Sequence, residues 1–384
     1  MSQYITGAGS SCWGCLEDTY GAGIPDGTTT SDTSLINMTS ESISTTYNRL
    51  EEGTLLASKT RPAQDLASVT VSGGISTIFK PDFADFIFEW AMGKKSTTAS
   101  TDYSWYTGYT VNEYTLANPD EDLPSAALYL NRSLPKKGGL PQNFLFDGLT
   151  VSSVAFDCTA QDFVKADINI SGRNETLEND DPSPAAPSST GTGSYKCTSA
   201  RLIHKPAGTQ NLQAWFLQDT NNVWYFPWNT CPAGQVWDVS RTQFTIDNGL
   251  EEAPATYCSG LYANQPSHGQ RGVTLACEVP YSQSFEDFRQ DYYANTDPDN
   301  LALLLTFGTK EEHDFTISGA TSADDVTIKV PDHQIFILIP NVNIDGADAN
   351  VGGQGLINSN FNGTALSIGN VEPLKVIKAD YNAN

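Results

Sequence analysis

Cysteine and histidine are the residues of this sequence that could bind a metal or carry out redox chemistry. Cys12 and Cys15 are separated by Trp13 and Gly14, which is the spacing of a zinc-binding or redox-active pair. A zinc site also needs a second cysteine pair or nearby histidines. The other cysteines are scattered, and no two histidines have metal-ligand spacing: Cys158, Cys197, Cys231, Cys258, Cys277, His204, His268, His313 and His333. We interpret Cys12 and Cys15 as small buried thiols and expect no cofactor and no metal.

Residues for hydrolytic or nucleotide chemistry show no recognisable pattern. The sequence contains no Gly-x-Ser-x-Gly elbow, no Walker loop and no Gly-x-Gly-x-x-Gly after a strand. Residues 345–350 are acidic like a calcium loop but lack its oxygen spacing and its terminal glutamate, so we expect a solvated turn. The sequence contains many carboxylates that could form the catalytic pair of a glycosidase, but nothing in it singles out two of them. A β-sandwich hydrolase is therefore a weak hypothesis, and we expect no enzyme.

A dense group of aromatic residues could bind a ligand by stacking. The group is Tyr103, Trp105, Tyr106, Tyr109 and Tyr114. Exposed aromatic side chains stack on sugars or bases, whereas buried ones pack across neighbouring strands. We predict a strand or hairpin over residues 103–116, which favours packing. A carbohydrate-binding or adhesive β-sandwich is the alternative function that these side chains would serve.

Length, composition and charge narrow the class of protein. The 384 residues suffice for two or three domains, and 39% hydrophobic content with abundant Gly, Ser, Thr and Asn indicates a turn-rich β protein. The net charge of −24 disfavours binding to nucleic acid or to anionic membranes. No apolar run is long enough to span a bilayer, and residues 1–6 do not have the pattern of a secretory signal. We expect a protein made in a cytoplasm, with no membrane partner.

One stretch, residues 34–93, organises the first part of the chain. Alternating residues predict strands over 35–43 and 68–79, joined by a charged connection. Pro81 ends the second strand, and Asp82 is placed to cap a helix over residues 82–92 with one apolar face. Gly93 is expected to end that helix. A helix with one apolar face must pack on a sheet.

The same order of elements recurs about 200 residues later. Residues 243–248 correspond to the first strand, 272–280 to the second, and 284–293 to the helix. Glu251 and Glu252 follow the first of these strands, as Glu51 and Glu52 follow theirs. We interpret this as an internal duplication of a β-rich module; the other interpretation is a chance similarity between two β regions.

Domain boundaries follow from this duplication and from local composition. Residues 1–29 are rich in Gly, Ser and Thr and are expected to form an arm that orders on a neighbour or stays loose. The first module is predicted over 30–178, a Pro-, Ser- and Gly-rich linker over 179–194, and the second module over 195–384. Further strands are predicted near 125–131, 144–157, 164–172, 212–217, 223–226, 301–307, 326–330 and 334–339.

The first module resembles the tail tube (major tail) proteins of long, non-contractile-tailed bacteriophages. The resemblance is carried by Ser40-Glu41-Ser42, the charged loop over 49–61, Val69-Thr70-Val71-Ser72-Gly73, Trp90-Ala91-Met92-Gly93 and residues 146–153. It covers residues 31–175 well and the second half through the repeat. It implies a mainly β fold of two tandem tail-tube-type β-sandwich or barrel modules, each with one flanking α-helix.

The resemblance also implies a function. Proteins of this family are structural virion proteins whose subunits close into rings, and the rings stack into the hollow tail tube through which DNA is ejected into the host. The expected partners are further copies of the chain in rings, other tail proteins (tape measure, terminators and tail tip), and passing DNA that is not bound specifically. Two fused modules would make each ring a trimeric pseudo-hexamer. The expected location is the virion tail, after assembly in the host bacterial cytoplasm.

Two sets of residues are candidates for these contacts. The charged connection is the expected contact between rings, although an ordinary solvated hairpin would have the same composition: Arg49, Glu51, Glu52, Lys59 and Arg61. Asp157 and Asp167 occupy outward polar positions of predicted strands and are candidates for the wall of the lumen. The alternative is that the acidic side chains lie mostly on the outer surface and serve solubility.

Overall fold

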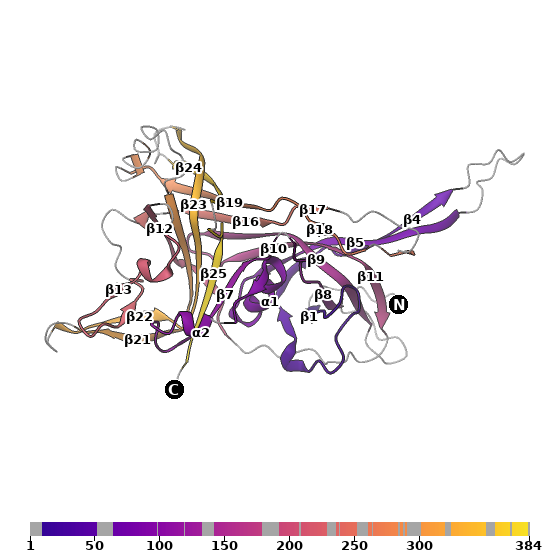
Figure 1. The fold of residues 1–384 in the computed structure, drawn as a ribbon, viewed down its shortest axis with the longest axis horizontal. Coiled ribbons are helices and arrows are strands. Elements are labelled where there is room, and N and C mark those ends of the chain that lie inside the picture. The colour runs from indigo at the N-terminus through magenta and orange to yellow at the C-terminus, as the bar shows by residue number, and fades with distance from the viewer. Residues whose placement is uncertain are drawn as a thin grey trace, which may run out of the picture.

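Strands dominate the computed structural model of the chain, as predicted, and helices are few. The structure describes residues 10–51, 64–97, 99–118, 120–132, 142–178, 192–206, 209–228, 236–237, 239–251, 260–262, 264–282, 285–286, 289, 301–318, 324–350, 358–368 and 371–382. Figure 1 shows an elongated arrangement in which helix α1 packs beside the strands and the β4–β5 hairpin projects at one end. The mainly β fold class is therefore confirmed.

In its described part, the first half of the chain contains one longer helix, two short helices and eleven strands. Its helices are η1 (Thr30–Asp32), α1 (Pro81–Met92) and α2 (Ala99–Asp102). Its strands are β1 (Ser11–Leu16), β2 (Ser34–Ile36), β3 (Met38–Glu41), β4 (Ser44–Glu51), β5 (Gln64–Ile78), β6 (Gly93–Lys95), β7 (Tyr109–Leu116), β8 (Ala126–Asn131), β9 (Asn143–Thr159), β10 (Lys165–Gly172) and β11 (Asn174–Glu178).

The second half has one described 3-10 helix, η2 (Leu212–Trp215). Its strands are β12 (Tyr195–Pro206), β13 (Leu217–Gln218), β14 (Trp224–Tyr225), β15 (Val236–Trp237), β16 (Arg241–Asp247), β17 (Leu250–Glu251), β18 (Ser267–His268), β19 (Gly272–Pro280), β20 (Leu301–Thr309), β21 (Glu312–Ile317), β22 (Val326–Pro331), β23 (His333–Asn350), β24 (Asn358–Ala365) and β25 (Lys375–Tyr381). The predicted helix over 284–293 is described only at Phe285, Glu286 and Arg289, which are helical; its other residues lie outside the described ones.

Helix α1 forms where the sequence predicts it, with a different start. Pro81 occupies its first turn and Lys80 the cap position, so Asp82 lies inside the helix rather than capping it. Gly93 ends the helix with a φ of 90°, in the left-handed region, and its N–H donates to the Glu89 carbonyl. Trp90 is fully buried, and its Nε1 donates to the Leu149 carbonyl of β9 at 2.9 Å. The apolar face therefore packs on the sheet, as expected.

The long strand β9 organises the pairing of the first half. Its N-terminal part pairs with β8 on one side and with β11 on the other. Its C-terminal part pairs with β10, which pairs with β5, and β5 pairs with β4. The outer partner of β8 is β1.

The long strand β23 has a similar set of partners in the second half, without a counterpart of the β9–β16 pair. Its N-terminal part lies between β20 and β25, and its C-terminal part pairs with β24. Strand β24 pairs with β19, β19 pairs with β16, and β20 pairs with β12. The order β16–β19–β24–β23 thus matches β4–β5–β10–β9, and all of these pairs are antiparallel.

Two pairings join the halves into a continuous structure. Strand β9 pairs with β16 from Ser153 opposite Asp247 to Thr159 opposite Arg241, and β7 pairs with β25 along its whole length. The largest hydrophobic core cluster contains residues of both halves, including the fully buried Phe79, Tyr195 and Phe244. Because core and sheet are shared, the halves are parts of one folded body.

The N-terminal segment differs from the expected arm. Residues 11–16 form β1, which pairs with β8 and β2 of the same chain, so this part of residues 1–29 is built into the sheet. Cys12 and Cys15 are both buried, as interpreted from the sequence. They lie three positions apart on a strand, so their side chains point to opposite faces and cannot bind one ion together.

Three other predictions are wrong in detail. Residues 345–350 form part of strand β23, with a register shift near Gly346, and not a solvated turn. Leu212–Trp215 is a 3-10 helix and not a strand. Strand β7 begins at Tyr109, because Gly108 with a φ of 85° makes a turn before it.

Most of the aromatic group from residue 103 onwards is buried. Tyr103 and Tyr106 belong to a second core cluster, which contains Phe216, Phe226 and Phe336 of the other half. The rings of Tyr106 and Tyr109 stack with centroids 4.2 Å apart, and Trp105 contacts Phe216 edge to face. The packing interpretation therefore fits these side chains better than a stacking surface for sugars.

Candidate assembly surfaces

One broad sheet with an exposed polar face extends across both halves. It runs in the order β4–β5–β10–β9–β16–β19–β24–β23, and the β9–β16 pair is its centre. Apolar residues alternate with polar ones along its strands, with the apolar side facing the core. The exposed side carries Lys165, Asp167, Asn169, Arg241, Gln243, Asp247, Thr274, Ala276, Asn360 and Asn362.

The two candidate lumen residues lie on this polar face. Asp167 of β10 is exposed and forms no ion pair with a described residue, whereas Asp157 of β9 is partly buried. Arg241 of β16 donates to both carboxylate oxygens of Asp157, with its Nε 3.2 Å from Oδ1. Hydrogen bonding to Asp157 raises the pKa of Arg241. One expected negative charge is therefore neutralised by a cation of the neighbouring strand.

The lysine on this face is neutralised in the same way. Lys165 Nζ lies 2.6 Å from Asp162 Oδ2. Hydrogen bonds from Lys165 and from the Phe163 backbone N–H lower the pKa of Asp162. Lys165 and Arg241, the two cations on this part of the sheet, thus each have a carboxylate partner. They are poorly placed to bind a phosphate tightly.

Two shallow hollows occur on the polar face, at corresponding strands of the two halves. The first, of about 230 Å³, is lined by residues of β3, β5 and β10 and includes Asp167. The second, of about 280 Å³, is lined by residues of β16, β19 and β24 together with Asp345 of β23. Each hollow has an acidic side chain and is otherwise lined mostly by small polar residues.

The broad sheet has an open edge at each end. Among the described residues, β4 pairs with β5 alone. Residues 343–350 of β23 likewise pair with β24 alone among the described residues. An open edge presents unpaired backbone N–H and C=O groups, and it is a template for pairing with another chain.

The candidate contact loop is only partly visible. Arg49 is exposed and lies within β4, and Glu51 is the last residue of that strand, so the strand continues further than predicted. Glu52, Lys59 and Arg61 lie outside the described residues. Strands β4 and β5 form a hairpin that projects from the rest of the molecule (Figure 1).

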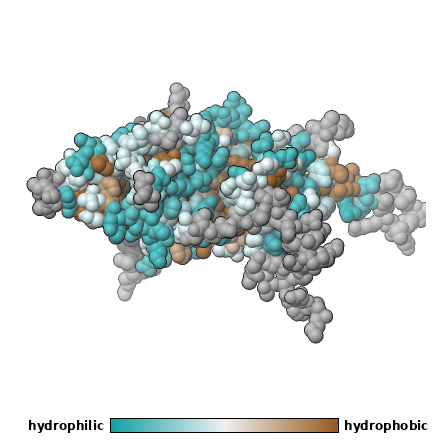
Figure 2. Space-filling view, turned by 90° about the horizontal axis from the view of Figure 1, so that it is seen from below, coloured by the Kyte–Doolittle hydropathy of each residue, from teal (hydrophilic) through white to brown (hydrophobic). Residues whose placement is uncertain are grey.

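The stem of this hairpin carries exposed apolar side chains that sequence reasoning missed. Tyr47 is 57% exposed and Leu50 is 66% exposed, and Leu66 of β5 is also exposed. In Figure 2, brown apolar residues lie near the end of the molecule that carries the uncertain grey tip. The sequence predicts a charged connection here, and it does not reveal that these residues belong to two paired strands with exposed apolar side chains.

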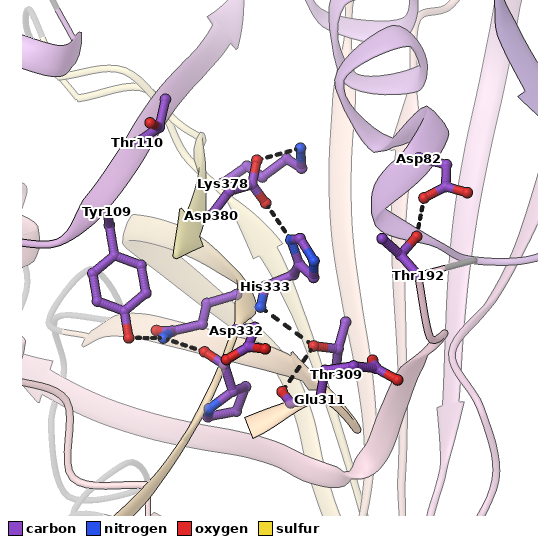
Figure 3. A network of polar contacts seen from close by, with 12 residues as sticks. Asp82, Tyr109, Thr110, Thr192, Thr309, Glu311, Asp332, His333, Lys378 and Asp380 are labelled. Atoms are coloured by element: carbon purple, nitrogen blue, oxygen red, sulfur yellow. Dashed lines mark hydrogen bonds and ion pairs between the residues drawn. The ribbon is translucent and has the colours of Figure 1, made fainter. Parts of the chain in front are cut away.

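A buried ion-pair network joins the two halves, and Figure 3 shows its members Lys378, Asp380 and His333. Lys378 of β25 is only 4% exposed, and its Nζ donates to Asp85 of α1 and, at 2.7 Å, to Asp380. His333 Nδ1 of β23 lies 2.8 Å from Asp380 Oδ1. Asn112 of β7 donates to Asp85 at 2.9 Å. Strands and helix from both halves thus converge on one cation.

The charges in this network shift each other's pKa values. Burial alone would lower the pKa of Lys378, but the carboxylates of Asp85 and Asp380 raise it above its usual value. Burial alone would raise the pKa of Asp380, but hydrogen bonds from His333 and Lys378 hold it below its usual value. The network is thus a structural ion pair at the place where β7 pairs with β25, which we call the seam between the two halves.

No helix in the described part of the chain is long and apolar enough to cross a membrane. No group of three or more metal-ligating side chains is found among the described residues.

Comparison with known proteins agrees with the resemblance seen in the sequence. The family model described as phage tail tube protein matches residues 7–365, which is nearly the whole chain. No curated protein matches the chain significantly. The match extends across both halves, the shared core and the broad sheet. The chain therefore belongs to the phage tail tube protein family, whose members are structural components of the phage tail.

Proposed function

We propose that this chain is the repeating subunit of a hollow tail tube, in which subunits close into rings and rings stack along the tail. The observation that carries the proposal is the broad sheet with an open edge at each end. Joining the β4 edge of one copy to the residue 343–350 edge of the next would continue the sheet from chain to chain. A head-to-tail contact of this kind forms a ring if its rotation closes.

We also propose that the chain consists of two fused tube modules, over residues 30–178 and 195–384. The support is the recurrence of the pairing scheme, in which β9 and β23 have corresponding partners on both sides. The proposed linker over 179–194 is described only from residue 192 onwards. If two modules replace two subunits, three chains form a six-module ring.

The polar face of the broad sheet is proposed to line the lumen, where DNA passes during ejection into the host. Its small polar side chains and the neutralised cations Lys165 and Arg241 offer few tight contacts to phosphate. The chain's net charge of −24 adds repulsion. At physiological salt that repulsion extends over about 8 Å, so it acts close to the wall. Asp167 is the better candidate for a free negative charge in the lumen.

Contacts with the rest of the tail complete the proposal. The β4–β5 hairpin is proposed to contact the next ring, with Arg49 and Glu51 at its described end and the exposed Leu50 between them. The ends of the tube would bind the terminator and tail-tip proteins, and the tape measure protein would occupy the tube before ejection. Assembly is proposed to take place in the cytoplasm of the host bacterium.

Electron microscopy and mass measurement test this function. The purified chain is expected to form rings or tubes with a central channel in negative stain, because its open edges favour pairing between copies. The mass of an isolated ring, measured under native conditions, is expected to equal three chains. Monomers that never associate at high concentration would contradict the tube, and a ring of six chains would contradict the trimer alone.

A further inference from the structure

Two buried cysteines from different halves of the chain meet at the base of the broad sheet. Cys158 lies near the end of β9 and is 4% exposed, and Cys197 lies in β12 and is 7% exposed. Strands β9 and β12 are in contact, and both cysteines belong to the largest core cluster. A disulfide between them would need a rotation of the side chains that brings the two sulfurs together.

The surroundings leave room for such a rotation. Both cysteines line a cavity of about 40 Å³, which is enough for about one water molecule. The rest of its lining includes Ala160, Ala200 and Val239, whose side chains are small or aliphatic. Both cysteines therefore border a small unfilled space.

The strand around Cys197 also offers a route for access. Strand β12 pairs with β20 at Tyr195 and Lys196 and again from Arg201 onwards, with a register shift between them. Cys197 falls within this irregular stretch, where the ladder to β20 is interrupted and its N–H donates instead to the Asp162 carbonyl at 3.0 Å. Segments with interrupted backbone pairing open locally at lower cost than regular strands do.

We propose that Cys158 and Cys197 are an oxidation site, at which a small-molecule disulfide converts the two thiols into a disulfide that links the first half of the chain to the second. The bond would span the proposed linker, because residues 158 and 197 lie on either side of residues 179–194. The inference concerns this chain alone and does not depend on ring or tube formation.

The reaction is a thiol–disulfide exchange. The thiolate of one cysteine attacks oxidised glutathione, forms a mixed disulfide and releases one glutathione thiolate. The second cysteine loses its proton to solvent and attacks the mixed disulfide, which forms the Cys158–Cys197 bond and releases a second glutathione. The two cysteines lose two protons and two electrons, and one oxidised glutathione becomes two reduced molecules.

The reaction is expected to be slow in the folded protein. The neighbouring Cys197 thiol and burial both raise the pKa of Cys158, so little thiolate is present near neutral pH. Raising the pH is therefore expected to accelerate the cross-link. A reducing cytoplasm would keep the pair reduced, and an oxidising medium would close it.

The experiment compares the reduced full-length chain before and after prolonged incubation with oxidised glutathione at mildly alkaline pH. Peptide mapping without reduction is expected to find one cross-linked species that contains residues 158 and 197. The unmodified chain is expected to lose these two thiols and to unfold at a temperature on the order of 5 °C higher. Cys158→Ala is expected to lack both changes.

The matched control is Cys277→Ala, which removes a third buried cysteine whose sulfur lies 3.9 Å from Thr242 Oγ1. This variant is expected to form the cross-link as the unmodified chain does. The proposal is overturned if the folded chain keeps residues 158 and 197 reduced, if a glutathione adduct persists on either of them, or if they link only after denaturation. Should Cys158→Ala fail to fold, the peptide map of the unmodified chain still decides.

Discussion

Lys378 is a charged side chain that the protein buries almost completely, and it is acceptable only because two carboxylates contact it. An isolated ammonium in the core would lose its proton or destabilise the fold. Here Asp85 comes from α1 and Asp380 from β25, so the cation joins elements that are far apart in the sequence. A single substitution at this position therefore tests the seam between the two halves.

Lys378→Met is expected to destabilise the protein by about 3 kcal/mol, because it leaves Asp85 and Asp380 without their cation. Chemical denaturation measures the change in the free energy of unfolding. The pH dependence is a second readout. The pKa of Asp380 is lowered from 3.8, so its contribution is present above pH 3.8 and is lost as the pH falls through its lower folded value.

The pKa of Lys378 is raised from 10.5, so its contribution is present below pH 10.5 and is lost as the pH rises through its higher folded value. The difference in the free energy of unfolding between the unmodified protein and the variant should thus be largest between the folded-state pKa values of Asp380 and Lys378. Lys165→Met removes an exposed lysine that also has an aspartate partner, and it should change stability little. Equal effects of the two substitutions would argue against a special role for the buried pair.

Asp157→Asn tests whether paired cations keep the polar face from binding DNA. The substitution leaves Arg241 without its carboxylate partner, and a free guanidinium binds phosphate. We expect the variant to bind a fluorescent DNA oligonucleotide more tightly than the unmodified protein does, with the excess lost at high salt. The double variant Asp157→Asn/Arg241→Gln should return to the unmodified level. Equal DNA binding by all three proteins would count against this role of the pair.

The elements of the first half were predictable because their local signals agree with their tertiary setting. Alternation identifies β5 and β10, and the pair Pro81 and Gly93 marks the two ends of α1. The failures occur where tertiary contacts override the local pattern. Residues 345–350 are acidic and glycine-containing, yet they continue β23 because β24 pairs with them. Residues 212–215 are apolar at short spacing, but they close a 3-10 turn over the aromatic cluster.

The projecting hairpin of β4 and β5 is the element on which contact between rings is proposed to depend. Reversing the charges of Arg49, Glu51, Glu52, Lys59 and Arg61 is expected to shorten tubes while leaving the melting temperature of the subunit nearly unchanged. Exposed charges contribute little to folding, whereas a weak contact repeated along a tube has a large total effect. Tube length in electron micrographs and thermal unfolding of the disassembled subunit are the two measurements.

A more specific test of the contact between rings uses Leu50, an exposed apolar residue of the same hairpin. Leu50→Asp should shorten tubes if the hairpin is buried between rings, because a charge would be placed in that contact. Leu217→Asp is the matched control, since Leu217 is 41% exposed on β13, which pairs with β14 in a separate two-stranded sheet. Tubes of normal length from Leu50→Asp would rule out burial of this residue between rings.

Removal of strand β25 tests how far the folding of the whole molecule depends on pairing between distant segments. Deleting residues 375–384 leaves an edge of β7 and an edge of β23 unpaired and removes Lys378. We expect the truncated chain to aggregate, with a reduced soluble fraction and no single peak in gel filtration. Deleting only residues 383–384 should leave both properties unchanged. A soluble and monomeric truncated chain would show that the seam is dispensable.

The joining of the two halves was largely invisible in the sequence. Repeated order of elements indicates two similar units, but hydrophobic alternation does not state which strand lies beside which. The β9–β16 pair and the β7–β25 pair are contacts between segments that no local motif connects. The residue types of the candidate surfaces, such as Asp167, could be predicted from the sequence. Which of the acidic side chains are neutralised by partners such as Arg241 could be seen only in the fold.

The β7–β25 pair also has a consequence in time. Tyr109 pairs with Tyr381, so 272 residues are synthesised between the two partners (381 − 109). At typical translation rates that interval lasts roughly 10–50 s. During this interval, one edge of β7 is unpaired, and Asp85 lacks its cation. Nascent chains on neighbouring ribosomes are vulnerable to mispairing of this edge in this period, and the arrival of β25 ends it.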